Sequence, residues 1–206
     1  TANPKLDEAW AIFDKLRASG DKSEGVAVGL ALSKFTRFSS WGVSGAPGSK
    51  QADLQEAADL LRPWVGAQGT SPQTKMLYAD VLNYLSHTLP EGQDIATCEE
   101  ARKILLNVGA RDLSDLRAAS IYADTADSQA RHSLKAGKVK EAEQLENEVY
   151  AMAEKVLAQR PGDLRSMANR ALAADFLGRL AIRRHDYVAA TDYAARSALA
   201  GENYVR

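Results

Sequence analysis

The stretch Trp41 to Lys50 (WGVSGAPGSK) comes nearest to a reactive motif in this sequence. A phosphate-binding loop follows the pattern GxxxxGK[ST] between a strand and a helix, so that backbone amides and the helix end face the phosphates. Here Gly42 and Gly48 are separated by five residues, and Lys50 follows a serine instead of preceding it. A nucleophile elbow follows the pattern GxSxG, and Ala46 stands where the last glycine belongs. Neither motif is intact.

We therefore interpret residues 41–50 as a connection between two helices, with glycines that allow positive φ and a proline that favours a turn. Ten residues is long for such a connection. Because long loops often carry function, a recognition loop stays open as the alternative.

Three histidines, His87, His132 and His185, are the candidates for metal ligands. Each falls near the end of a predicted helix, where a histidine interacts favourably with the helix dipole. Metal ligands of this type normally cluster at short spacings, and no HxxxH or HxxE pattern is present. We expect no metal ion and no cofactor.

A polar stripe recurs on three predicted helices and is the candidate partner-binding surface. Seven residues form it: Asp80, Asn83, Asp127, Arg131, Asp175, Arg179 and Arg183. The functional interpretation is a mixed-charge groove that holds an extended peptide or a helix, with salt-sensitive binding. A solvated helix face is the alternative, because exposed charges are common on protein surfaces.

The elements that must position these residues are all helices. Alanine, the best helix former, is abundant, and β-branched runs of alternating polarity are missing. The predicted helices span about 5–18, 21–40, 49–62, 71–88, 95–107, 114–137, 139–159, 163–184 and 186–200. Pro63 should kink or end the third helix, and Gly201 should end the last.

Several helix starts carry capping signals. Ser71 precedes Pro72, which combines a capping hydroxyl with proline at the first helical position. Asp163 is the predicted cap of the eighth helix. Asp21 with Glu24 has the spacing of a capping box, in which each side chain accepts from an amide at the helix start.

An internal repeat consists of a small residue followed four positions later by a bulkier one. The copies are Ala9 with Phe13, Ala57 with Leu61, Ala101 with Leu105 and, more weakly, Ala142 with Glu146 and Ala190 with Ala194. The alanines are 48, 44, 41 and 48 residues apart. Alanine at a helix crossing lets two axes approach closely, and a larger residue one turn later fills the adjoining groove.

The C-terminal third, from about 115 to 206, resembles the tetratricopeptide repeat family. The marks are Leu177 with Gly178, then Asp186 with Tyr187, then Ala190. Residues 154–163 (EKVLAQRPGD) are similar to the close of one repeat and the opening of the next. The sequence departs from the family at Ala181 and Ala194, where bulky aromatics are usual, and in its period, since the family repeats every ~34 residues.

The resemblance implies antiparallel helix pairs stacked as a right-handed superhelical solenoid, which binds another protein on its concave face. By analogy, it also implies a repeat region attached to a bacterial kinase, cyclase or regulator. We interpret residues 1–206 as one such domain and as a piece of a larger protein.

Composition narrows the function classes. A net charge of −1 disfavours nucleic-acid binding, which usually needs a basic excess. The longest apolar run, Gly25 to Leu32, is too short to cross a membrane. A single cysteine, Cys98, excludes an internal disulfide. We expect a cytoplasmic protein, and a periplasmic one stays open.

The sequence therefore favours a non-catalytic scaffold that binds a protein or peptide partner on the concave face. A structural spacer or self-association region, which would form a homodimer, is the alternative. An enzyme is the least favoured class, because no catalytic motif is intact.

Overall fold

The computed structural model describes residues 4–39 and 50–205 of the chain, and all regular structure within them is helical. Nine α-helices and one π-helical turn follow in this order: α1 (Pro4–Ala18), α2 (Glu24–Ser39), α3 (Lys50–Val65), α4 (Pro72–Ser86), α5 (Gln93–Leu105), η1 (Leu106–Ala110), α6 (Leu116–Lys135), α7 (Val139–Gln159), α8 (Leu164–Arg183) and α9 (Tyr187–Val205). The prediction of an all-α chain with nine helices is confirmed for these residues.

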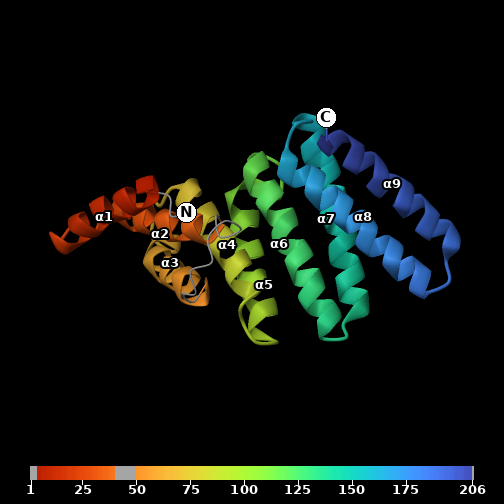
Figure 1. Cartoon of the computed structure of the whole chain (residues 1–206), viewed down its shortest axis with the longest axis horizontal. Coiled ribbons are helices and arrows are strands. Elements are labelled where there is room, and N and C mark those ends of the chain that lie inside the picture. The colour runs from red at the N-terminus through yellow and green to blue at the C-terminus, as the bar shows by residue number, and fades with distance from the viewer. Residues whose placement is uncertain (1–3, 40–49, 206) are drawn as a thin grey trace.

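The helices follow one another along the longest axis of the molecule, from α1 at the red end to α9 at the blue end (Figure 1). Each helix packs antiparallel against the next one in the chain. Further contacts join α2 to α4, α4 to α6 and α6 to α8, whereas no contact joins two odd-numbered helices in the described part of the chain. The even-numbered helices therefore form a continuous row, and the odd-numbered helices lie behind it.

The recurrent alanines lie on the odd-numbered helices, and all of them except Ala9 are buried. Three of them, and two of the leucines that follow one turn later, have no exposed surface: Ala57, Ala101, Ala142, Leu61 and Leu105. This burial agrees with the predicted role of alanine at helix crossings. The exception is Glu146 on α7, a fully buried acid at the position where α3 and α5 carry leucine.

A polar contact also repeats from one helix pair to the next. The hydroxyl of Tyr78 on α4 lies 3.4 Å from Arg62 Nε on α3 and donates to Glu100 on α5 over 2.9 Å. One pair later, Arg102 on α5 donates over 2.6 Å to Tyr122 on α6, whose hydroxyl donates to Glu148 on α7. Each Arg–Tyr–Glu trio joins three consecutive helices, so the repeat is present in polar contacts as well as in the core.

The predicted caps of α4 and α8 are confirmed, but the capping box before α2 is wrong. Ser71 and Asp163 accept hydrogen bonds from amides three residues later, those of Thr74 and Ser166. At the start of α2, the capping side chain is Ser23, whose Oγ accepts from the Val26 amide. The predicted pair of Asp21 and Glu24 does not form the cap.

Glu24 acts on a distant helix rather than on its own. Its carboxylate accepts from the backbone amide of Ser71 over 3.2 Å and from the Thr74 hydroxyl over 2.5 Å. Glu24 therefore fastens α2 to the start of α4.

Two helix ends differ from the prediction. Helix α3 continues through Pro63 to Val65, because a proline in the last turn removes only one helical hydrogen bond. Helix α9 continues through Gly201 to Val205, since a glycine ends a helix only where the backbone adopts positive φ. Among the residues that the structure describes, no helix combines the length and apolarity that a membrane crossing requires.

Candidate functional site

The N-caps of three even-numbered helices set a common register for the polar stripe. Ser71, Asp115 and Asp163 each accept from the amide three residues later, at 3.1, 2.9 and 2.9 Å. Counting from these caps makes positions on α4, α6 and α8 equivalent. Twelve residues after the cap stand Asn83, Asp127 and Asp175, and sixteen residues after it stand His87, Arg131 and Arg179. Residues four apart lie on one helix face, so each helix presents both positions together.

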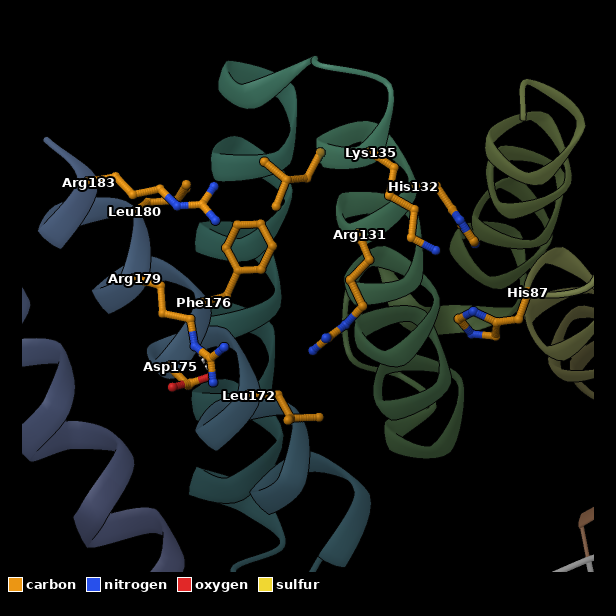
Figure 2. A pocket seen from close by; sticks show the side chains of 11 residues that line it. His87, Arg131, His132, Lys135, Leu172, Asp175, Phe176, Arg179, Leu180 and Arg183 are labelled. Carbon is orange, nitrogen blue, oxygen red and sulfur yellow. Dashed lines mark ion pairs between the residues drawn. The ribbon is translucent and has the colours of Figure 1, made fainter. Parts of the chain in front are cut away.

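A groove with a volume of about 560 Å³ lies between α6 and α8 and extends to the end of α4 at His87. We call it the α6/α8 groove. Its volume falls within the ~300–1,000 Å³ range of small-ligand pockets. Figure 2 shows side chains of α6 and α8 pointing into the space between the two helices.

Apolar side chains form part of the lining. They are Leu134 from α6 with Leu172, Phe176 and Leu180 from α8. The Phe176 ring lies centrally, between the basic side chains of the two helices (Figure 2). Leu172 is 44% exposed, although water-exposed leucine surface is unfavourable. The groove therefore offers apolar contact to a ligand.

Basic side chains form the rest of the lining, and they divide into two kinds. Arg131 donates two hydrogen bonds to Asp127, over 2.9 and 3.0 Å, and Arg179 lies 2.9 Å from Asp175. Each of these arginines is paired with the acid four residues earlier on its own helix.

Lys135 and Arg183 also line the groove, twenty residues after the caps of α6 and α8. Neither makes an ion pair with any residue in the described part of the chain. Both are therefore available to an incoming anion.

A buried carboxyl pair lies behind Arg131. Glu146 from α7 is fully buried and adjoins Asp127, with Arg131 as the nearest compensating charge. Burial and the neighbouring Asp127 carboxylate raise the pKa of Glu146 to about 9. Glu146 is therefore protonated at neutral pH. Only one negative charge of the pair then opposes the Arg131 guanidinium.

Four of the seven sequence-predicted residues meet in the groove: Arg131, Asp175, Arg179 and Arg183. Asp127 lies beside it as the partner of Arg131. Asp80 and Asn83 do not join the others, because they are 8% and 2% exposed and lie on α4. Their prediction as part of an open stripe is corrected: both are buried in contacts between helices.

Asp80 and Asn83 belong to a closed polar cluster, which we call the α4/α6 seam: Asp80, Asn83, Asp124 and Arg165. Arg165 from α8 lies 3.2 Å from Asp80 Oδ1, and Asn83 Nδ2 donates to Asp124 over 2.9 Å. Burial raises the pKa of Asp124 to about 6, although Arg165 opposes this shift. Burial also raises the pKa of Asp80. These contacts join α4 to both α6 and α8.

Two of the three histidines meet beside the groove. The rings of His87 and His132 are 5.2 Å apart, centroid to centroid, and His87 Nε2 lies 3.1 Å from Ser128 Oγ. Burial is the main cause that lowers the pKa of both imidazoles, so both are neutral at pH 7. His185 lies apart, beside Tyr187. No group of three or more metal-ligating side chains occurs among residues 4–39 and 50–205.

Ser86, His132 and Asp94 lie in the order of a hydrolase triad. Ser86 Oγ is 3.3 Å from His132 Nε2, and His132 Nδ1 is 3.0 Å from Asp94 Oδ2. A catalytic serine must meet its substrate. Ser86 is 0% exposed, and its hydroxyl donates to the carbonyl of Asn83 over 2.6 Å. These contacts join α4, α5 and α6 within the core, and we assign them a structural role.

Sequence reasoning missed Lys135, His87 and the apolar lining of the groove. Counting from the helix caps would have found the first two, because Lys135 is equivalent to Arg183 and His87 to Arg131. The proposed recognition loop, residues 41–50, lies outside the described residues except for Lys50, the first residue of α3. No family model matches this chain, and no curated protein matches it in sequence.

Proposed function

We propose that the chain is a non-catalytic binding module that holds a peptide segment of a partner protein in the α6/α8 groove. The observation that carries the proposal is the combination of exposed apolar surface at Leu172 with basic side chains from two helices around one cavity. Apolar lining with a few convergent polar groups is typical of binding sites.

The proposal extends to the finer architecture. We infer a right-handed superhelix of the tetratricopeptide type, with the even-numbered helices on its concave face. Contacts along that row, and none between odd-numbered helices in the described part, support the inference, because neighbouring units lie closer on the inside of a curve. A crystal structure with α1 packed against α9 would contradict it.

Selection from a random peptide library tests the binding function and does not require an identified partner. We expect a peptide that binds the wild-type chain and loses at least tenfold in affinity for the double variant Leu172→Ala/Arg179→Ala, because both changes remove groove surface. The matched control is Leu164→Ala/Arg196→Ala.

The control changes a similarly exposed leucine and an arginine that is likewise paired with the acid four residues earlier, both outside the groove. Equal loss in the two double variants, or selection of no peptide, contradicts the proposal. Circular dichroism of both variants verifies that helicity is unchanged.

A second candidate is a spacer or self-association region. Large apolar side chains are exposed at the α8–α9 turn: Ile182 at 55%, Tyr187 at 63% and Val188 at 85%. Such surface favours contact between copies of the chain. Sedimentation of the chain decides: a dimer that dissociates on Val188→Asp supports self-association, and a monomer at all concentrations contradicts it.

A further inference from the structure

We propose that the occupant of the α6/α8 groove is an acidic peptide segment with a large apolar side chain. This inference rests on the proposed function and specifies the chemistry of the partner. The charge, the register and the apolar lining of the groove support it.

The charge of the groove opposes that of the whole molecule. Four basic side chains line it, namely Arg131, Lys135, Arg179 and Arg183, against the single lining carboxylate of Asp175. The chain carries a formal net charge of −1. Charge complementarity at such a local excess attracts an anionic partner and repels a basic one.

The two basic residues without an ion pair lie at the same level of the groove. Lys135 ends α6 and Arg183 ends α8, each twenty residues after its N-cap. Because the two helices run parallel in the even-numbered row, this register places both cations at one end of the groove. The acidic residues of the ligand therefore bind at that end.

Both cations could instead serve only to offset the helix dipoles. A helix C-terminus carries roughly half a negative charge, so one full positive charge on each terminal side chain reverses the local sign. If Lys135 and Arg183 only offset the helix dipoles, replacing them changes the stability of the chain but not its affinity for a peptide. If they contact the ligand, replacing them lowers that affinity.

The apolar lining of the groove selects a ligand with an apolar side chain. Leu172 and Phe176 line it together with Leu134 and Leu180. A peptide that passes between α6 and α8 therefore directs one apolar side chain onto Leu172 and Phe176.

Fluorescence anisotropy with short labelled peptides tests the inference. The first probe alternates aspartate and leucine, the second replaces each aspartate by lysine, and the third replaces each leucine by alanine. We expect saturable binding of the first probe only. Its affinity should fall as ionic strength rises, because the Debye length shortens from about 30 Å at 0.01 M to about 8 Å at 0.15 M.

The decisive variant is Lys135→Ala/Arg183→Ala, compared with Lys103→Ala/Lys155→Ala. The control removes the same two charges from exposed positions outside the groove. We expect about tenfold weaker binding of the Asp–Leu probe by the groove variant and an unchanged affinity in the control. An equal loss in both variants attributes binding to net charge alone and overturns the inference.

The remaining outcomes separate this inference from the proposed function. Preference for the lysine probe, with loss in Leu172→Ala/Arg179→Ala, overturns the acidic partner but retains peptide binding. Binding of the Asp–Leu probe that Lys135→Ala/Arg183→Ala leaves intact limits both residues to helix stability and also overturns the inference. Failure of all three probes overturns the inference, while the library selection still tests the function.

Discussion

The α4/α6 seam and the α6/α8 groove are built on equivalent helix positions, yet the seam is closed and the groove is open. In the seam, Asn83 stands twelve residues after the cap of α4 and donates to Asp124, nine residues after the cap of α6. In the groove, the same two positions hold Asp127 and Leu172. An amide and a carboxylate can share a hydrogen bond, whereas a carboxylate and a leucine cannot.

The partners of Asp127 show the consequence. Without a donor opposite, Asp127 accepts from Arg131 on its own helix and lies beside the protonated Glu146. Asp175, the next equivalent residue, likewise pairs with Arg179 on its own helix. The acids of the groove are therefore paired within single helices, and among the described residues no hydrogen bond joins α6 to α8 at this level. The helix arrangement is the same in both regions, and the groove is open because Asp127 and Leu172 stand where the seam has Asn83 and Asp124.

Removing the shared cation of the seam should have the largest effect on stability. Arg165→Met keeps the aliphatic stem but removes the ion pair of the buried Asp80 and the main positive charge near Asp124, so that only Arg117 still offsets Asp80. We expect a loss of about 3 kcal/mol, at the lower end of the range for breaking a buried pair, because Arg165 is partly exposed. Urea denaturation at neutral pH measures this loss.

The matched groove variant is Arg179→Met. Its ion pair with Asp175 is exposed at both ends, so the expected loss is below about 0.5 kcal/mol. Similar losses for Arg165→Met and Arg179→Met would remove the distinction between a closed seam and an open groove.

The buried carboxyl of Glu146 should give the groove side a characteristic pH dependence. Its folded pKa of about 9 is above its ordinary value of 4.5, so its protonated form stabilises the fold fully below pH 4.5, and this contribution is lost as pH rises toward 9. The greatest possible slope is about 1.4 kcal/mol per pH unit. We expect the free energy of unfolding to decline from pH 7 to pH 9 in the wild type and to decline much less in Glu146→Gln, where only the buried Cys98 thiol, with its pKa raised to about 11, still contributes.

The window from pH 7 to 9 avoids the histidines, whose lowered pKa values place their titration below it. Asp124, with a pKa of about 6, is ionised throughout and contributes little slope. Parallel curves for the wild type and Glu146→Gln in urea titrations would show that Glu146 is ionised in the folded chain, and the account of Arg131 would then be wrong.

The sequence predicts the helices well because their signals are local. Ser71 and Asp163 cap the helices that they precede, and the buried alanines follow the predicted repeat. The same reasoning from local spacing gives a wrong prediction for Glu24, because its hydrogen-bond partners lie 47 and 50 residues away, at the start of α4. The spacing of Asp21 and Glu24 is that of a capping box, and it does not reveal that Glu24 forms its hydrogen bonds with another helix.

The candidate site is only partly predictable for a related reason. The stripe residues share a helix face, but their exposure depends on the residue of the next helix. Asn83 is buried because it meets Asp124, whereas Asp175 stays exposed. The raised pKa of Glu146 depends likewise in part on Asp127, which belongs to another helix. The residues of the neighbouring helix therefore decide which side chains of the periodic stripe stay exposed.

A small effect is also expected from converting the groove toward the seam. Leu172→Asn places an amide opposite Asp127, as in the seam, and we expect it to weaken the binding of the Asp–Leu probe. Leu172→Ala removes the same apolar surface without a donor, so any new hydrogen bond should make Leu172→Asn more stable than Leu172→Ala by up to about 1 kcal/mol.

Leu164→Asn and Leu164→Ala repeat the comparison at an exposed leucine of the same helix that lies outside the groove. Since asparagine has a lower helix propensity than alanine, Leu164→Asn should be the less stable of this control pair. Thermal denaturation measures the stability of all four variants. If the asparagine variant is the more stable one at position 172 and the less stable one at position 164, the new amide at 172 forms a hydrogen bond with Asp127. The same order at both positions would mean that the opening of the groove does not depend on which side chain faces that acid.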